Sequence, residues 1–438
     1  MCKIKEYRNK LFEKWNSKDA ASSIFKNMAI LSSGTVVARA LTLLTAPVLT
    51  RIYSPEDFGV LSFYGAVAAI LVPFGTLRYS MAIPLPKKDG VAVNLTFISL
   101  FFLSLVSLLV AFLFVFWGSS ILELFSMEQL LPYWWLLPIG LAGNGLSEIL
   151  GHWAVREKAF KPLAKTTVWQ TIQGAVVKIG LGMVGVKPLG LLIGEIFYQT
   201  GGVLILLRSC YQTIRCNLRH VAKYRILFCL KRYTDFPRYR LPSQFLVALS
   251  TRMPILFFSW QYGAEVTGQL GLALALIALP MVLFGQTTGQ AYYAEIAKIG
   301  KRNPDEIWAI TKKITKRLFY TSIAPFLALF VGSPWLFEFF FGEQWLDAGI
   351  YARILSFYLL VQFITAPIMK LLNIFKTQRI FFVLNIYRFF VILISFAIGF
   401  LFQFEALYTL ICYSLFYSIY CGYIFVYVMN VARSRVVA

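Results

Sequence analysis

The chain has 438 residues, of which 58% are hydrophobic, 17% aromatic and only 14% charged, and its mean hydropathy is +0.68. Water-soluble domains carry roughly 25% charged residues. The composition therefore excludes an ordinary soluble enzyme and indicates a protein embedded in a membrane. The formal net charge of +22 would fit a nucleic-acid partner, so the position of the basic residues along the chain has to decide that question.

The first 24 residues form a basic segment that precedes the first apolar stretch. It lacks the short apolar core and small-residue cleavage site of a secretory signal peptide. We expect a basic amphipathic helix on the inner membrane surface, with a disordered tail as the alternative.

Twelve apolar stretches follow, each long enough to span a bilayer. A helix needs about 20 apolar residues to cross roughly 30 Å of hydrocarbon. The sequence therefore predicts an all-α polytopic membrane protein. The expected spans are 25–49, 58–78, 92–117, 129–151, 166–186, 188–208, 241–261, 266–291, 317–337, 351–373, 380–402 and 405–430.

The basic residues gather on one side of these spans. If the odd-numbered connections lie outside, most of the 42 Lys and Arg residues fall in inner segments, while the outer connections are richer in acidic residues. This asymmetry is the positive-inside rule. It predicts cytoplasmic termini, a cytoplasmic linker at 209–240 and a cytoplasmic tail at 431–438, and it removes the need for a nucleic-acid partner.

A motif of the form Y-x-x-E-x-x-G occurs twice, at Tyr53–Gly59 and again 209 residues later at Tyr262–Gly268. Each copy follows a proline-containing apolar run and opens the next span. The offset is close to half of the chain, which predicts two six-helix halves, 25–208 and 241–430, related by an axis along the membrane normal. We expect each motif to form a tight outer turn, with its glycine permitting an unusual backbone and its glutamate facing water.

Several segments resemble one transporter family. They are APVLTRIYSPEDFGVLSFY, TLRYSMAIPLPKKDGVAVNL, YTDFPRYRLPSQF, GQAYYAEIAKI and FFFGEQWLDAGIYARIL. Together they resemble the polysaccharide transporter branch of the multidrug/oligosaccharidyl-lipid/polysaccharide exporter superfamily, which includes O-antigen and capsule flippases. That family often carries an acidic residue just after the position of Arg78-Tyr79, where this chain has Ser80, so the resemblance assigns no coupling role there.

The resemblance implies a function without covalent chemistry. A flippase of this family moves polyprenyl-pyrophosphate-linked oligosaccharide repeat units, of O-antigen or capsule type, from the cytoplasmic to the outer leaflet by alternating access. It implies a multi-pass protein of the bacterial inner (cytoplasmic) membrane, acting in lipopolysaccharide or other polysaccharide biosynthesis, with a glycan polymerase and chain-length proteins as further partners. It implies no enzymatic activity and no cofactor.

Five arginines are candidates for binding an anionic substrate. A charge inside hydrocarbon costs at least roughly 2.5–3.5 kcal/mol, so embedded charges usually face a bundle interior or a wet cavity. Arg39 and Arg252 lie near the middle of the first and seventh spans, and arginine binds phosphate oxygens in a bidentate manner. We expect them to line a cationic cavity that holds the pyrophosphate, with packing or snorkelling as the alternative. Arg388, Arg51 and Arg78 are weaker candidates, for which snorkelling or interfacial anchoring competes.

Three further embedded charges form a second group. Lys178 and Glu195 lie at similar depth on either side of a short outer turn, so they are predicted to form a buried ion pair or to contain a carboxylate that exchanges a proton or cation. Glu148 lies near the inner end of the fourth span, close to Arg156. We expect it to be a water-exposed residue at a helix end, with an ion pair or coupling role as the alternative.

Two other functions remain open. A cation-coupled drug antiporter of the same fold would favour acidic cavity residues, whereas the embedded charges here are mostly basic. A membrane glycan polymerase or ligase would need polar catalytic groups on a sizeable outer loop, and the outer connections are short. The chain contains only two histidines and six scattered cysteines without C-x-x-C spacing, so we expect neither a metal site nor a disulfide framework.

Overall fold

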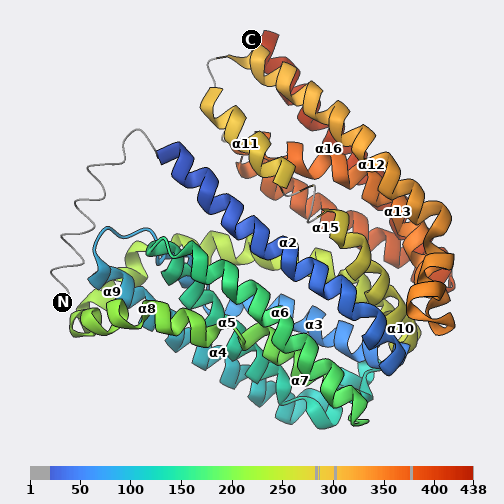
Figure 1. Ribbon diagram of the computed structural model, residues 1–438, viewed down its shortest axis with the longest axis horizontal. Helices are drawn as coiled ribbons and strands as arrows, with labels where there is room; N and C mark the ends of the chain where they lie inside the picture. Colours follow the sequence, from blue (N-terminus) through green and yellow to red (C-terminus); the bar gives the residue numbers. More distant parts are fainter. Residues whose placement is uncertain (1–19, 282–284, 286, 300–302, 375–377, 438) are drawn as a thin grey trace.

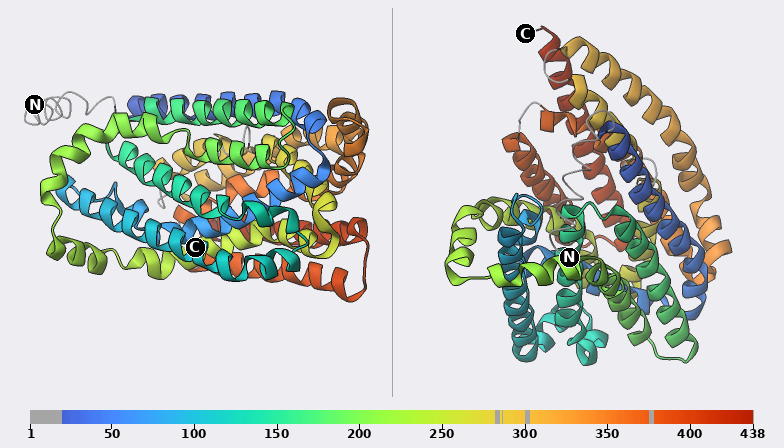
Figure 2. Two further views of the ribbon diagram at one scale, coloured as in Figure 1. Left: turned by 90° about the horizontal axis from the view of Figure 1, so that it is seen from below. Right: turned by 60° about the vertical axis from the view of Figure 1, so that its left-hand side comes forward.

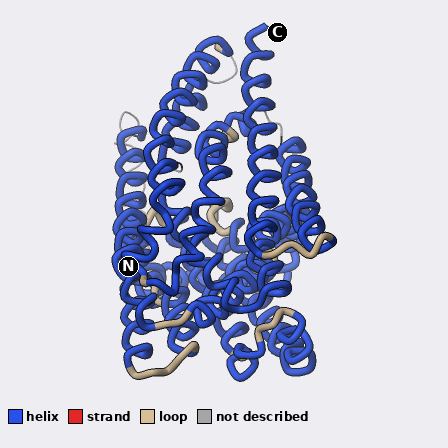
Figure 3. The backbone as a smooth tube through the Cα atoms, turned by 90° about the vertical axis from the view of Figure 1, so that its right-hand side faces the viewer, coloured by secondary structure: helices blue, strands red, loops and turns tan. Residues whose placement is uncertain are grey.

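The computed structural model describes residues 20–281, 285, 287–299, 303–374 and 378–437. Within these residues the secondary structure is helical and contains no strand (Figure 3). The predicted all-α fold class is confirmed. The N-terminal basic helix proposed for residues 1–24 falls mostly outside the described part of the chain, where α2 begins at Ala20.

The N-terminal half of the protein consists of residues up to the end of α8. Its helices are α2 (Ala20–Ile52), α3 (Pro55–Gly75), η1 (Tyr79–Ala82), α4 (Asp89–Leu124), η2 (Glu128–Tyr133), α5 (Leu136–Arg156), α6 (Phe160–Met183), α7 (Leu189–Thr200) and α8 (Val203–Asn217). The proposed linker at 209–240 is itself largely helical, because α8 extends into it and is followed by η3 (Leu218–His220), α9 (Lys223–Arg232) and a π-helical turn, η4 (Phe236–Arg240).

The C-terminal half begins with the longest described helix. Its elements are α10 (Leu241–Pro280), α11 (Thr287–Ile299), α12 (Pro304–Phe341), η7 (Glu343–Trp345), α13 (Leu346–Ile368), α14 (Leu371–Ile374), α15 (Gln378–Leu401) and α16 (Ala406–Val437).

Nine helical segments of the described chain are long and apolar enough to cross a membrane. One of them contains α10, in which two spans meet at Gly263, where φ is 81° and ψ is −173°. Helices α5 and α6 have spanning length, with 21 and 24 residues, but carry more polar side chains. Dividing α10 and adding these two helices yields the twelve expected spans.

The two halves lie side by side and diverge toward one end (Figures 1 and 2). In Figure 1, helices α4 to α9 lie to the lower left and helices α12 to α16 to the upper right. We call the end where α2 begins and α16 ends the terminal face. The opposite end carries the short turns at 53–54, 184–188 and 402–405, and we call it the turn face.

The turn between α2 and α3 is built by local capping. Ser54 and Asp57 form a capping box, in which the Ser54 amide donates to the Asp57 carboxylate at 3.0 Å and the Asp57 amide donates to the Ser54 hydroxyl at 3.2 Å. Pro55 occupies the first helical position, where its missing N–H costs nothing. At the equivalent place in the second copy, Gly263 reverses the chain through its positive φ. The two copies therefore make the same turn by different means.

The motif tyrosines anchor this turn to the last helix pair of their own half. The Tyr53 hydroxyl donates to the carbonyl oxygen of Lys178 in α6 at 2.7 Å. In the second half, the Tyr262 hydroxyl donates to the carbonyl of Phe404, between α15 and α16, at 2.7 Å. Both tyrosines therefore bind within the last helix pair of their half, although Tyr53 reaches the interior of α6 and Tyr262 reaches the turn between α15 and α16.

The motif glycines lie where the two halves touch. A Cβ atom on Gly59 would overlap the carbonyl oxygen of Ala264, and a Cβ atom on Gly268 would overlap that of Pro55. These contacts are reciprocal, since Pro55 and Ala264 are equivalent in the repeat. Both glycines are inside helices, so the expectation that they permit an unusual backbone is wrong. They permit α3 and α10 to approach closely, and this is the most extensive helix pair in the described structure.

Hydrogen bonds between the halves close the turn face. Ser259 of α10 donates to the carbonyl of Phe125 at 2.6 Å. Gln344 and Trp345 of the C-terminal half both donate to the carbonyl of Thr50, at 2.7 and 3.1 Å, and Trp345 is fully buried. Toward the terminal face the seam between α3 and α10 continues through the ring pair of Phe74 and Phe245, with centroids 5.2 Å apart.

A candidate cationic site between the halves

Embedded charges from both halves meet around Glu195. The ammonium group of Lys178 lies 2.7 Å from the Glu195 carboxylate, and the two side chains are 14% and 20% exposed. The ion pair considered for these residues is therefore present. Lys178 is on α6 and Glu195 on α7, two antiparallel helices joined by the turn at 184–188.

Small residues bring α6 and α7 close enough for this pair to form. A Cβ atom on Gly194 of α7 would overlap the Lys178 side chain of α6. A Cβ atom on Gly174 of α6 would likewise overlap the Tyr198 side chain of α7. Close packing at small residues is a common way to hold helices together in a membrane. The glycine-rich sequence of α6 thus positions Lys178 against α7.

Arginines complete the group, which we call the Glu195 cluster: Arg39, Lys178, Glu195, Tyr198 and Arg252. Arg252 of α10 interacts electrostatically with Glu195 across the boundary between the halves. Its side chain is solvent-exposed. Tyr198, which is 37% exposed, interacts with both Arg39 and Glu195.

An amide beside the cluster has free hydrogen-bonding capacity. The Nε2 atom of Gln199 donates to Glu195 at 3.4 Å, while its Oε1 atom is buried without a hydrogen-bond partner among the described residues. A buried polar atom normally has a partner in the protein or in ordered water. The Gln199 oxygen can therefore accept one further hydrogen bond.

Arg78 and Glu148 form a separate group near the terminal face. Arg78 donates to the Glu148 carboxylate at 3.0 Å, and the Ser80 hydroxyl donates to the same oxygen at 2.7 Å. His152 lies 3.6 Å from that oxygen. The expectation of a water-exposed Glu148 beside Arg156 is wrong, because the Glu148 side chain is 17% exposed and Arg156 pairs instead with Asp89, at 2.7 Å.

Two of the five candidate arginines stay apart from both groups. Arg388 of α15 donates to the carbonyl of Val247 at 3.1 Å within the C-terminal half, and its charge faces the tyrosines of α16, including Tyr417 and Tyr420. Arg51 is exposed at the end of α2 on the turn face. Arg388 and Arg51 therefore lie apart from the Glu195 cluster, and Arg78 belongs to the separate group with Glu148. Arg39 interacts with Tyr198 of the cluster, and Arg252 interacts with Glu195.

Tyr198 and Gln199 were absent from the sequence-based candidates. Both follow Glu195 by one helical turn on α7, at i+3 and i+4, so they occupy the same face of the helix. This spacing is the signal in the sequence that points to them, but neither side chain is charged at neutral pH, so embedded charge does not identify them.

Comparison with known proteins agrees with this architecture. Residues 48–350 match a protein family described as polysaccharide biosynthesis protein, whereas no curated protein matches the sequence significantly. The lipid II flippase MurJ in an inward closed conformation is similar in structure, with a TM-score of 0.71 and 15% identity over 91% of this chain and 87% of MurJ.

Two structures of multidrug resistance MATE family transporters of the MOP superfamily are similar as well. The inward-facing conformation has a TM-score of 0.70 and 14% identity over 91% of this chain and 95% of that one. The outward-facing conformation has a TM-score of 0.58 and 15% identity over 94% and 95% of the two chains. At these identities the likeness establishes the fold and no more. The family match covers more than half of the sequence, and the chain is a multi-pass membrane protein that belongs to the polysaccharide biosynthesis protein family, with a MATE- and MurJ-like fold.

Proposed function

We propose that this protein is a flippase that moves polyprenyl-pyrophosphate-linked oligosaccharide repeat units, of O-antigen or capsule type, from the cytoplasmic to the outer leaflet of a bacterial inner membrane. The observation that carries the proposal is the composition of the Glu195 cluster. It contains three cations from three helices, and one of them, Arg252, belongs to the opposite half. A pyrophosphate is the kind of anion that arginine and lysine bind well when they converge on a partly desolvated site.

The closure of the molecule supports an alternating-access cycle. The halves are joined at the turn face by the close approach of α3 and α10 at Gly59 and Gly268 and by hydrogen bonds to the carbonyl oxygens of Thr50 and Phe125. The greater similarity to the inward-facing than to the outward-facing MATE structure agrees with a turn face that is closed. With the turn face outside, as the positive-inside rule favours, the described state loads its cargo from the cytoplasm.

Glu195 is the group that we propose for energy coupling. Its carboxylate contacts Lys178 directly and interacts with Arg252 in the other half. Rocking of the halves changes the distance to Arg252, and the proton or cation affinity of Glu195 changes with it. The drug antiporter is disfavoured by the cationic character of the same cluster, and a glycan polymerase or ligase by the short turns of the turn face.

Reconstituted transport tests this proposal. The purified protein is placed in liposomes that contain a polyprenyl-pyrophosphate oligosaccharide with a fluorescent label on its glycan, and a membrane-impermeant quencher reports the leaflet. We expect Arg252→Ala and Arg39→Ala each to slow translocation about tenfold or more, since a lost charge-assisted hydrogen bond costs about 1.5–3 kcal/mol. Arg252→Lys should retain part of the rate.

The matched control is Arg433→Ala, which removes one exposed cation at the terminal end of α16 and should leave the rate unchanged. Full translocation by both cluster variants would contradict the proposed binding site. Absence of translocation by the wild-type protein, with folding verified, would contradict the function itself.

A further inference from the structure

A preformed pocket opens on the turn face of the C-terminal half. It has a volume of about 600 Å³, within the range of roughly 300–1,000 Å³ that is typical of small-ligand sites. Its lining comes from the end of the first span of α10 and from the turn between α15 and α16: Gln261, Tyr262, Phe400, Leu401, Gln403, Phe404, Glu405 and Ala406. The pocket is remote from the Glu195 cluster in sequence and belongs to one half only.

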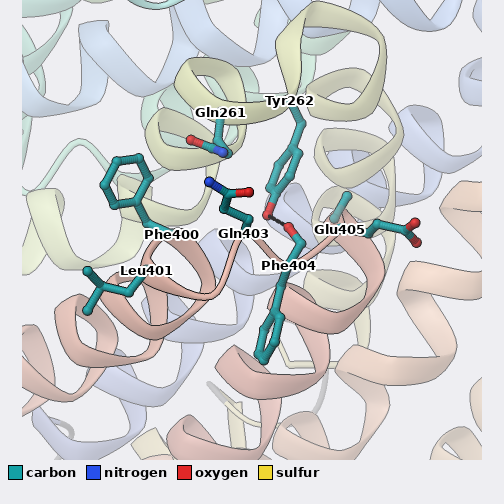
Figure 4. A pocket seen from close by; sticks show the side chains of 8 residues that line it. Gln261, Tyr262, Phe400, Leu401, Gln403, Phe404 and Glu405 are labelled. Atoms are coloured by element: carbon teal, nitrogen blue, oxygen red, sulfur yellow. Dashed lines mark hydrogen bonds between the residues drawn. The ribbon is translucent and has the colours of Figure 1, made fainter.

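Hydrogen bonds hold the frame of this pocket in place. The Tyr262 hydroxyl bonds to the carbonyl of Phe404 at 2.7 Å and to the hydroxyl of Thr409 at 2.6 Å. The turn itself closes through the amide of Phe404, which donates to the carbonyl of Gly399 at 2.9 Å. Gln403 adopts a positive φ of 51°, which turns its side chain toward Gln261 (Figure 4).

The polar lining has unused hydrogen-bonding capacity. In the described structure, the side chains of Gln261, Gln403 and Glu405 make no hydrogen bond to protein. Figure 4 shows the two amides facing each other, with the Phe400 ring on one side and the Tyr262 ring on the other. The two amides offer both donors and acceptors, while the rings supply apolar surface; the Glu405 carboxylate points away from the amides (Figure 4).

The repeat provides an internal comparison. The position equivalent to Gln261 in the first half is Ile52, and the turn equivalent to 402–405 is 184–188. There the ammonium of Lys187 lies over the ring of Tyr53 at 5.7 Å, and the turn sequence VGVKP contributes no amide side chain. The tyrosine anchor is common to both halves and serves the fold. The two amides that line the pocket at the second copy of this turn have no counterpart at Ile52 or in the turn at 184–188, so the shared architecture does not require them.

We propose that this pocket is a saccharide-binding site. A sugar ring presents hydroxyl groups that donate and accept hydrogen bonds at its rim and C–H groups on its faces. The Gln261 and Gln403 amides match the rim, and the exposed ring of Phe400 matches a face. A single carboxylate, Glu405, is too little charge for a metal or a polycation, and the described residues include no group of three or more potential metal ligands.

The choice of a glycan as the ligand rests on the proposed function, which places lipid-linked sugars at this membrane surface. Exposed Phe400, Leu401 and Phe402 adjoin exposed Gln403 and Glu405, so the pocket lies where an apolar belt meets water. A sugar attached to a lipid carrier arrives at that level. The site would hold the glycan on the release side while the lipid remains in the bilayer.

Binding of lipid-free saccharides tests this site separately from transport. Soluble oligosaccharides released from bacterial O-antigen and capsule polysaccharides are titrated into the protein in nanodiscs, because glycoside detergents would compete for the pocket. Saturation-transfer NMR and calorimetry measure the interaction. We expect Gln261→Ala and Gln403→Ala each to weaken binding about fivefold or more, and Trp260, whose ring lies 5.0 Å from that of Phe400, to change its fluorescence on binding.

Two controls define the alternatives. Gln129→Ala removes an exposed amide on the turn face of the first half, and Lys187→Ala alters the equivalent turn; both should bind as the wild type does. Translocation is measured on the same preparation. Two results would overturn the proposed saccharide site and leave the proposed function intact. One is saccharide binding that depends on Arg252 but not on Gln261 or Gln403, and the other is no saccharide binding by a protein that translocates. Pocket-dependent binding by a protein that does not translocate would support the site and count against the flippase.

Discussion

Gly59 and Gly268 show how single residues control the packing of the two halves against each other. Each lies in a helix and each meets the backbone of the other half, at Ala264 and Pro55. A methyl group at either position has no room while the turn face is closed. The glycine therefore determines how closely α3 and α10 approach, and we propose that it thereby sets the balance between a closed and an open turn face.

Replacing these glycines should open the turn face. We expect Gly59→Ala and Gly268→Ala to increase the reaction of a cysteine at position 259 with a membrane-impermeant maleimide several-fold, in a background without native cysteines. Ser259 is fully buried between the halves in the closed form. Gly65→Ala is the control on α3, since a Cβ atom there meets nothing within 4 Å. Unchanged labelling in both glycine variants would show that the seam does not govern closure.

The Lys178–Glu195 pair allows structural and coupling roles to be separated. Removal of one partner leaves a charge unpaired in a partly buried site, and we expect K178A or E195A to destabilise the protein by about 1–3 kcal/mol. The double variant should recover part of that loss. If Glu195 also exchanges a proton, translocation by the double variant loses its pH dependence. A double variant with normal rate and unchanged pH dependence would exclude coupling through Glu195.

At the scale of helices, the repeated turn is the element that organises each half. Tyr53 and Tyr262 tie the turn between the first two spans to the last two spans. The tyrosine of each turn bonds to a backbone carbonyl of the last helix pair, Tyr53 inside α6 and Tyr262 in the turn between α15 and α16, although the turns differ, one with a capping box and the other with Gly263. We expect this anchor to help hold the six helices of each half together.

Loss of either anchor should therefore reduce stability. We expect Tyr53→Phe and Tyr262→Phe each to lower the free energy of unfolding by about 1 kcal/mol, the usual value for one hydrogen bond, as measured by thermal unfolding in detergent. Tyr408→Phe is the matched control, because this tyrosine is 56% exposed on α16. If Tyr53→Phe and Tyr262→Phe were as stable as the wild type and Tyr408→Phe, the two hydrogen bonds would contribute nothing to stability.

Span positions were largely predictable from hydropathy, because the membrane requires helices of about 20 apolar residues. Contacts between spans were harder to predict. Glu148 was expected to face water near Arg156. Instead, Arg78 adopts a left-handed backbone conformation with φ of 61°, and its guanidinium group donates to the Glu148 carboxylate. Gly59 and Gly268 were correctly identified as a repeat, yet their meeting across the halves depends on helix packing that hydropathy does not encode.

At the scale of the whole molecule, the twofold relation of the halves fixes the topology. Six spans per half return the chain to the side from which it started, so both termini must lie on one side and the turn face on the other. From the excess of basic residues on the side of the termini, we propose that this side is the cytoplasmic one.

Reporter fusions test this assignment. A fluorescent protein fused to the C-terminus should fold and fluoresce, and alkaline phosphatase fused there should be inactive. Phosphatase inserted after Gly185, in the turn at 184–188, should be active. An active C-terminal phosphatase would reverse the orientation and, with it, the proposed direction of loading.

The most direct test of the whole account is to delete the gene in its host and quantify polyprenyl-pyrophosphate-linked oligosaccharides by mass spectrometry, with an external glycosidase probing the leaflet. The account predicts accumulation of a single repeat unit that the glycosidase cannot reach. Absence of any accumulation, or accumulation of unpolymerised units that the enzyme cleaves from outside, would contradict translocation as the function of this protein.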